Sequence, residues 1–376
     1  MQLSQPILPS KIYAPAGIAR AKQNIGDDLG VVGLGALPVG GLAVALSSVG
    51  GLGVPGAAVM YNMGSPAALT GLETVPQDHV VQGFARCGPH MKQMMIATGK
   101  PGEGGSSSFW LSNEANTALT LLGTTAAGTW VSNLAEYRPY AGVSAGPNVM
   151  FMLMKWDEGE PCALPGRVRI GDGDQMILTV SDIPGNSGAE RFSNIVSARF
   201  SYLGDVAHLG MVYGYPAFVT VDSQPAYTRL EIGRSPDVNF AGPYIEVFQT
   251  DLPPGNVTCE AFSGYIGGTN CLALVGTGVA GYSYLYRSTD RGLTWALAGS
   301  FPHSCSPGRG HIHWLNNLEV FLSIGQILYY SRDGGGSWRK IINVGDEVAA
   351  LTGMADGSIY AGTQNGVIHR YAPLYW

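Results

Sequence analysis

The acidic residues are the first candidates for chemistry, because two carboxylates can act as a general acid and a general base. Asp290 and Asp333 occupy the same place in two similar stretches, YRSTDRGLTW and YYSRDGGGSW. The densest acidic cluster is WDEGE at 156–160, and Asp172 and Asp174 stand in GDGDQ. Glycoside hydrolysis needs two carboxylates about 5 to 10 Å apart. Both segments contain glycine, and GDGDQ lacks the closing Glu of a calcium loop, so the favoured interpretation of each is a solvated turn.

Two histidines are the main candidates for metal binding. His311 and His313 alternate along GHIHWL and therefore share one face of a predicted strand, where they could bind a metal with a third ligand. His303 and Cys305 are near in the sequence. Ordinary strand residues are the favoured interpretation, so we expect no metal and no cofactor. The chain also has no nucleophile elbow, no phosphate-binding loop and no dinucleotide fingerprint.

The two similar stretches share five positions: Ser, Asp, Gly, Ser or Thr, and Trp. The residues are Ser288, Asp290, Gly292, Thr294, Trp295, Ser331, Asp333, Gly335, Ser337 and Trp338. In a hairpin turn of this pattern the Asp carboxylate can accept hydrogen bonds from backbone N–H groups. The Gly supplies a positive φ, and the Trp fills an apolar gap. We therefore predict structural turns, with no catalytic residue among them.

The turns belong to a longer repeat. Tyr286, Tyr329 and His369 take matching positions, 43 and 40 residues apart, and each unit alternates apolar with small or polar residues, as strands do. A period of 40–45 residues with about four strands predicts an all-β chain, a β-propeller of six or seven four-stranded blades. The predicted strands are 311–316, 319–324, 327–331, 338–342, 348–354, 358–362 and 367–371.

The final repeat contains only three predicted strands. Because a propeller removes its open edge by borrowing a strand from the other terminus, we expect QLSQPIL or KIYAPAG to complete the last blade. Earlier in the chain, 108–119, 149–159 and 227–240 are interpreted as third strands with degenerate turns.

Three regions are predicted: closing strands at 1–28, a glycine-rich apolar elaboration at 29–74, and the propeller at 75–376. Residues 29–72 contain no charge but include three prolines and two Gly-Gly pairs. Short strands joined by glycine turns are the favoured interpretation. The alternatives are a membrane-active or lumen-lining insertion and a conventional membrane span.

Composition narrows the class of protein. Only 13% of the residues are charged and 54 of the 376 are Gly, which is typical of many tight turns and of a surface covered by other protein. The net charge of −6, without a basic cluster, disfavours nucleic-acid recognition. Five cysteines without a CxxC pair favour a reducing site of synthesis, and the N-terminus does not resemble a signal peptide.

The repeated turn resembles the Asp box of the sialidase-like propellers, also called BNR repeats. The resemblance implies a turn between the third and fourth strands of a blade, away from the ligand-bearing face. Sialidase chemistry needs three arginines, a Tyr nucleophile with a Glu partner, and an acid. The family's Arg-Ile-Pro motif is missing, and the nearest string is Arg167-Val168-Arg169-Ile170. We therefore expect no enzymatic activity.

In composition and architecture the chain is similar to bacteriophage tail propellers of the nozzle or hub type. The resemblance implies a non-catalytic virion protein that is synthesised in the host cytoplasm, forms a homo-oligomeric ring and contacts other tail proteins. Membrane contact is less favoured. One alternative is a glycan-active propeller, either a lectin or a sialidase-like hydrolase. Another is a cellular assembly factor, such as those that help build photosynthetic complexes. Fold alone does not choose among them.

Overall fold

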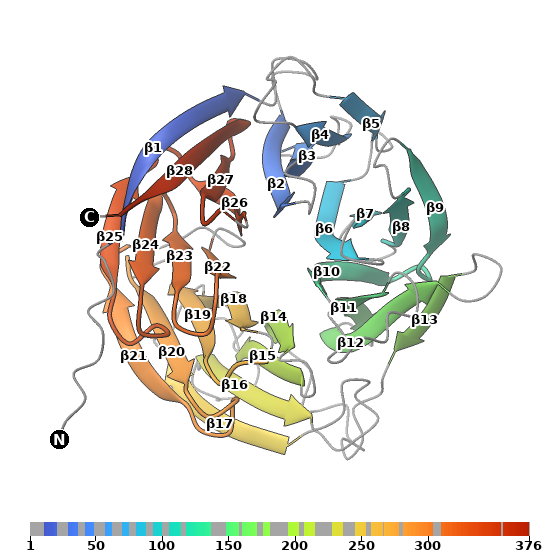
Figure 1. The fold of residues 1–376 in the computed structure, drawn as a ribbon. Coiled ribbons are helices and arrows are strands. Elements are labelled where there is room, and N and C mark those ends of the chain that lie inside the picture. Colours follow the sequence, from blue (N-terminus) through green and yellow to red (C-terminus); the bar gives the residue numbers. More distant parts are fainter. Residues whose placement is uncertain are drawn as a thin grey trace.

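The computed structural model is a closed ring of seven four-stranded antiparallel sheets, arranged as blades around a central axis (Figure 1). It describes residues 11–20, 29–36, 42–48, 57–61, 70–74, 80–87, 93–99, 105–113, 118–136, 148–157, 160–170, 176–180, 195–202, 207–214, 228–235, 245–252, 257–265, 267–277, 281–303, 310–354 and 356–375. The innermost strand of each blade contacts the innermost strand of the next blade, and the contact between the last and first blades closes the circle. The all-β fold and a blade count within the predicted range are confirmed.

The first four blades follow one another along the chain, each running from its innermost to its outermost strand. Blade 1 comprises β2 (Leu29–Ala36), β3 (Leu42–Ser48), β4 (Ala57–Tyr61) and β5 (Thr70–Thr74). Blade 2 comprises β6 (Val80–Cys87), β7 (Gln93–Gly99), β8 (Ser107–Ser112) and β9 (Leu119–Thr124). Blade 3 comprises β10 (Thr129–Glu136), β11 (Asn148–Asp157), β12 (Glu160–Ile170) and β13 (Met176–Val180). Blade 4 comprises β14 (Ile195–Tyr202), β15 (Ala207–Gly214), β16 (Thr228–Ser235) and β17 (Ile245–Leu252).

The last three blades contain the sequence repeat. Blade 5 comprises β18 (Val257–Gly264), β19 (Cys271–Thr277), β20 (Ser283–Ser288) and β21 (Ala296–Phe301). Blade 6 comprises β22 (Gly310–Trp314), β23 (Val320–Ile324), β24 (Ile327–Ser331) and β25 (Arg339–Asn343). Blade 7 comprises β26 (Val348–Gly353), β27 (Ile359–Thr363), β28 (Val367–Tyr375) and, outermost, β1 (Lys11–Arg20).

The N-terminal strand completes blade 7, as the sequence predicts. β1 runs antiparallel to β28, with Lys11 opposite Tyr375 and Arg20 opposite Val367, and the two strands lie side by side in Figure 1. The segment KIYAPAG fills the slot, whereas QLSQPIL lies outside the described residues. Tyr13 packs against blade 6, with its ring 4.8 Å from that of Phe321 and 5.3 Å from that of Tyr330. The N-terminus therefore connects two blades made from the C-terminal end of the chain.

Residues 29–74 are a blade, which corrects the predicted division into an elaboration and a propeller starting at residue 75. Small residues let β2 approach its neighbours closely: a Cβ on Gly35 would lie 2.8 Å from Phe84 of blade 2. The segment is therefore part of the ring and packs closely against blade 2. No helix that could cross a bilayer occurs among the described residues.

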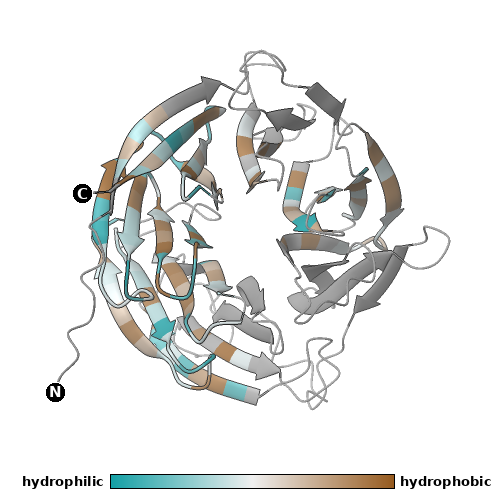
Figure 2. Ribbon diagram, viewed as in Figure 1, coloured by the Kyte–Doolittle hydropathy of each residue, from teal (hydrophilic) through white to brown (hydrophobic). Residues whose placement is uncertain are grey.

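Strand position within a blade explains the burial pattern. Every residue of β23 and β24 is buried, because these middle strands have a strand on each side and a blade on each face. β25 is the outermost strand, and its Arg339 and Lys340 are exposed. Figure 2 shows this change from hydrophobic middle strands to the hydrophilic start of β25. A continuous apolar run thus marks the middle of a blade.

The hydrophobic core lies between the blades. One cluster joins Leu272, Leu274 and Leu285 of blade 5 to Leu322 and Tyr329 of blade 6. Similar clusters join blade 4 to blade 5, blade 6 to blade 7, and blade 2 to blade 3. Blades 5 and 6 are therefore each packed against both of their neighbours.

Two of the three degenerate units were placed correctly. Segment 108–119 overlaps β8 and segment 227–240 contains β16, and both strands are the third of their blades. The prediction for 149–159 is wrong, because β11 is the second strand of blade 3. Its turn joins the second strand to the third, a connection that the repeated turn never makes.

Candidate functional surface on blades 5 and 6

The first repeated turn joins β20 to β21 and is held by its own polar groups. Ser288 Oγ donates to Asp290 Oδ1 at 2.7 Å and accepts from the N–H of Gly292 at 2.8 Å. Asp290 Oδ1 also accepts from the N–H groups of Leu293 and Thr294, at 3.1 and 2.9 Å. The Thr294 hydroxyl donates to Asp290 Oδ2 at 2.5 Å. Both carboxylate oxygens therefore bind the turn itself.

The second repeated turn, between β24 and β25, has the same geometry. Ser331 Oγ donates to Asp333 Oδ1 at 2.7 Å and accepts from Gly335 N–H at 2.8 Å. Asp333 Oδ1 accepts from the N–H groups of Gly336 and Ser337, both at 2.9 Å. Ser337 Oγ donates to Asp333 Oδ2 at 2.7 Å. Identical bonds in two blades show that the five shared positions encode this local structure.

These bonds keep both carboxyls ionised. Burial favours the neutral form, but the hydrogen bonds from Thr294 and Ser288 outweigh it and hold the pKa of Asp290 below its ordinary value. In the same way, bonds from Ser337 and Ser331 overcome burial and lower the pKa of Asp333. A general acid needs a raised pKa, so neither carboxyl is suited to that role.

Each turn ends on its tryptophan. Trp295 Nε1 donates to the carbonyl of Gly292 at 3.1 Å, and its ring stacks on Phe262 of β18 with centroids 5.4 Å apart. Trp338 Nε1 donates to the carbonyl of Gly335, also at 3.1 Å, and its ring meets Phe301 of β21 edge-on at 6.2 Å. Trp295 belongs to the hydrophobic cluster that joins blade 4 to blade 5, and Trp338 packs against the cluster that joins blade 5 to blade 6.

Two adjacent turns connect blade 5 to blade 6. Asn317, in the turn between β22 and β23, accepts at its Oδ1 from the N–H groups of Thr269 and Asn270, at 3.0 and 3.2 Å. Asn270 Nδ2 donates back to the carbonyl of Asn317 at 2.6 Å. Arg287 Nη2 donates to the carbonyl of Asp333 at 2.7 Å. The repeated turn of blade 6 is therefore fixed to blade 5 as well as to its own strands.

Three leucines of blades 5 and 6 are exposed to solvent. Leu293 follows the first turn's aspartate and is 52% exposed, and Leu318, in the turn between β22 and β23, is 51% exposed. Leu297 of the outermost strand β21 is 56% exposed. The connections that carry Leu293 and Leu318 lie at the same edge of their sheets, because they join first to second and third to fourth strands. Leucine side chains are thus exposed to solvent at the same edge of the sheets where the polar side chains of the repeated turns bind within the protein.

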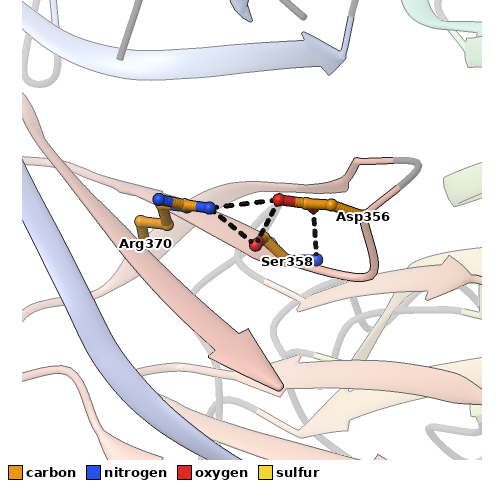
Figure 3. A network of polar contacts seen from close by, with 3 residues as sticks. All are labelled: Asp356, Ser358 and Arg370. Atoms are coloured by element: carbon orange, nitrogen blue, oxygen red, sulfur yellow. Dashed lines mark hydrogen bonds and ion pairs between the residues drawn. The ribbon is translucent and has the colours of Figure 1, made fainter. Parts of the chain in front are cut away.

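A third polar turn lies in blade 7, between β26 and β27 (Figure 3). Asp356 Oδ1 accepts from Ser358 N–H at 2.8 Å, and Arg370 Nη2 donates to Asp356 Oδ2 and to Ser358 Oγ, both at 3.1 Å. Burial acts to raise the pKa of Asp356, but the bonds from Ser358 and the charge of Arg370 lower it overall. The stretch GMADG at 353–357 is thus a turn, in which the Asp precedes the Ser by two residues, whereas in the repeated turns it follows the Ser by two.

The predicted histidine pair lies on β22, the innermost strand of blade 6, with both side chains half-buried. A Cβ on Gly353 would lie 2.7 Å from His313 Nε2, so His313 packs against blade 7. His303 follows β21, and its carbonyl accepts from Ser283 Oγ at 2.9 Å; Cys305 lies outside the described residues. No group of three metal-ligating side chains occurs within the part of the chain that the structure describes.

The acidic cluster 156–160 is the tip of the hairpin between β11 and β12, where Asp157 is paired with Glu160. Asp172 and Asp174 lie outside the described residues, between β12 and β13. The string 167–170 belongs to β12. The sequence candidates are thus spread over blades 3, 5 and 6.

One Tyr–Glu pair escaped the sequence analysis. The Tyr330 hydroxyl donates a short hydrogen bond to Glu319 Oε1, and Asn316 Nδ2 donates to Glu319 Oε2 at 2.7 Å. Burial and then the bond to Glu319 raise the pKa of Tyr330. This phenol is buried and stays protonated, so the pair supports structure and does not resemble an activated nucleophile. No local pattern predicts it, because the two residues meet only when β23 pairs with β24.

Three of the described arginines are engaged in separate parts of the ring. Arg86 of β6 donates to the carbonyl of Ala36 in blade 1, Arg287 binds the turn of blade 6, and Arg370 binds Asp356. A triad that clamps one carboxylate would need three guanidinium groups to converge. These three do not converge.

Neither a protein-family model nor a curated protein sequence matches the chain. Solved structures do match. One is "YCF48 bound to D1 peptide", with 10% identity, a TM-score of 0.55 and coverage of 97% of this chain and 99% of that one. The fold is that of a β-propeller. The β-propeller domain of Nup133 from Vanderwaltozyma polyspora has 11% identity, a TM-score of 0.53 and coverage of 97% and 100%. Sqt1 from Saccharomyces cerevisiae has 10% identity, a TM-score of 0.52 and coverage of 98% and 100%. At these identities the likeness concerns the fold alone.

Proposed function

We propose that this propeller is a non-catalytic structural component of a bacteriophage virion tail, of the nozzle or hub type, which contacts neighbouring tail proteins as part of a homo-oligomeric ring. The observation that carries the proposal is the surface of blades 5 and 6. Its carboxylates bind within the protein, and the side chains presented to solvent include Leu293, Leu297 and Leu318. Such a surface suits protein contact better than catalysis.

Composition supports the same proposal. Charged residues make up 13% of the chain, which is about half their share in an ordinary globular protein. A monomer whose whole surface faces water needs charged residues for solubility. A virion subunit whose surface is largely covered by neighbours has less need of charge. The two repeated turns further support membership of the Asp-box propellers, in which this turn is structural.

A glycan-binding or glycan-cleaving propeller is the alternative, and one observation favours it. Tyr282, in the turn between β19 and β20, is 48% exposed and offers an aromatic face for stacking on a sugar. This turn lies at the opposite edge of the sheet from the two repeated turns, because it joins a second strand to a third.

Native mass spectrometry with negative-stain imaging tests the proposal. Rings of several identical copies are expected, and Leu293→Asp with Leu318→Asp should weaken ring formation while leaving the far-ultraviolet circular dichroism unchanged. Ser300→Asp, at an exposed polar position of β21, is the matched control.

The contrary result is a monomer that binds or cleaves a sugar in a glycan array or a fluorogenic glycosidase panel. If Tyr282→Ala abolished that binding, the structural role would be replaced by the glycan role.

A further inference from the structure

The outermost strands of the blades share one exposed position. In most blades this strand has one extra residue relative to the third strand, which is a β-bulge. The residue just before the bulged one is exposed in every blade for which its burial is described: Leu121 in β9, Glu246 in β17, Leu297 in β21, Lys340 in β25 and Pro15 in β1. A bulge disrupts the row of free backbone groups at a sheet edge, so a partner meets these strands through their side chains.

Strand register shows that this position is equivalent in blades 4, 5 and 6. In each blade the exposed residue lies opposite a residue of the third strand that stands two positions before the final serine of that strand. The pairs are Glu246 with Gly233, Leu297 with Tyr286, and Lys340 with Tyr329, and the serines are Ser235, Ser288 and Ser331. The three exposed residues therefore lie on the rim of the ring at the same height along its axis.

The charge at this position reverses between blade 4 and blade 6. β17 of blade 4 exposes Glu246 and Asp251, whereas β25 of blade 6 exposes Lys340 beside Arg339. Asp251 lies opposite Arg229 of β16, so Glu246 is the main acidic residue of this surface. β21 of blade 5, which lies between them, contains no charged residue. One chain therefore carries an acidic and a basic surface at the same height, with a single blade between them.

Two surfaces of opposite charge at one height fit a second copy of the chain. Contact of blade 6 with blade 6 would place Lys340 opposite its own copy, and like charges disfavour such a contact. Contact of blade 6 with blade 4 of the next copy places Lys340 opposite Glu246. A head-to-tail contact closes into a ring when the rotation closes, and otherwise it grows into a filament. Because the two residues lie at the same height, this contact brings the copies side by side and favours a closed ring.

We propose that the rim of blade 6 binds blade 4 of a second copy, with Lys340 and the neighbouring Arg339 facing Glu246 across the contact. This inference rests on the proposed function, because it specifies the contact between copies in the proposed ring. An exposed ion pair contributes little affinity by itself, so these charges select which surfaces meet. Blade 5 lies between the two contacts and faces the centre of the ring, where Leu297 stays accessible to a neighbouring tail protein.

Charge reversal tests the contact on the full-length protein, with native mass spectrometry and analytical ultracentrifugation as the measurements. Lys340→Glu and Glu246→Lys should each weaken the association of copies about tenfold, because like charges then meet. The chain with both changes should assemble as the wild type does, which also shows that the substituted chains fold. An equimolar mixture of the two single variants should regain association, since alternating copies then present opposite charges.

Two further measurements check that the effect belongs to this contact. Thr120→Lys adds a charge at an exposed position of the outermost strand of blade 2, and it should leave association unchanged. Association of the wild type should weaken as the ionic strength rises, because salt screens exposed charges.

The results distinguish a wrong contact from a wrong ring. If wild-type rings form and neither single variant weakens them, the contact is wrong and the proposed ring remains. If the wild type assembles but the chain with both changes does not, the two surfaces do not meet, and the contact is again wrong. If the wild type stays monomeric, the ring of the proposed function and this contact are both wrong.

Discussion

The two repeated turns make the same internal hydrogen bonds in different surroundings. In the first turn Arg291 occupies the left-handed region with a φ of 63° and donates its N–H to the carbonyl of Thr269 at 2.8 Å. In the second turn Gly334 has a φ of 68° and donates its N–H to the carbonyl of Leu318, again at 2.8 Å. The backbone path is the same, although one residue is a long cation and the other has no side chain.

The neighbouring blade explains this difference. A Cβ on Gly334 would lie 2.5 Å from Asn270 Nδ2, and one on Gly335 would lie 2.7 Å from Leu272 Cδ2. Both contacted residues belong to blade 5. The five shared positions of the turn therefore determine its local shape. The residue types at the positions between them depend on the neighbouring blade.

Replacement of the tryptophan should give the largest difference in unfolding free energy between the two turns. Trp295 is 8% exposed and stacks on Phe262, whereas Trp338 is only partly buried. We expect Trp295→Ala to lower the free energy of unfolding by about 3 to 5 kcal/mol and Trp338→Ala by about 2 kcal/mol. Chemical denaturation measures both. Equal losses would mean that the two tryptophans contribute alike despite their different burial.

Substitution of Gly334 should reveal the contact with blade 5. Gly334→Ala must adopt a left-handed backbone and also displace Asn270, which is fixed by its bond to Asn317. We expect a loss of about 2 to 3 kcal/mol in the free energy of unfolding. Gly281→Ala is the control, because its φ is 67° and no heavy atom lies within 4 Å of its added Cβ. The control should lose only about 1 kcal/mol; a similar loss in both variants would contradict the role of the contact.

The smallest effect concerns acid sensitivity, which should be shared by the two turns. The folded pKa values of Asp290 and Asp333 lie below the ordinary value, so each carboxylate adds stability above its unfolded pKa. That stability is lost as the pH falls through the folded pKa, from about pH 5 downward. We expect Asp290→Asn and Asp333→Asn each to cost about 1 kcal/mol at neutral pH.

Measurement of unfolding at several pH values tests this expectation. The deficit of each Asn variant should shrink toward low pH, because the wild-type carboxyl is then protonated too. A deficit that is constant with pH would mean that the charge of the carboxylate contributes nothing. Thr179→Asn, in a strand without an acidic residue, is a control that should show a constant difference.

Local patterns predicted blades 5 to 7 well. Strand 327–331 was predicted with the bounds of β24, and the turns after β20 and β24 follow from five residues within eight positions. The prediction succeeded because the hydrogen bonds of these turns join residues at most four apart in the sequence. Such short-range bonds leave their mark in a short stretch of sequence.

Blades 1 and 3 were predicted poorly. Segment 29–74 contains no copy of the repeated turn, so its predicted short strands do not by themselves indicate a blade. The segment around β11 was assigned to the wrong strand, because the acidic tip at 157–160 looks like a degenerate repeated turn. The candidate surface is harder still to predict from the sequence. Leu293 and Leu318 lie at the same edge of their sheets only because of the order in which the strands pair.

The sequence by itself determined the repeat, the local shape of the repeated turns and the need for an N-terminal strand to complete the last blade. These features depend on residues near one another in the chain, or on a count of strands. Only the tertiary structure decided that Gly334 must be small, that Arg287 reaches the turn of the next blade, and that the outermost strands of blades 4 and 6 carry opposite charges at the same position. Those features arise where separate strands meet, and the physical reason is that packing and strand register are set by partners distant in the sequence.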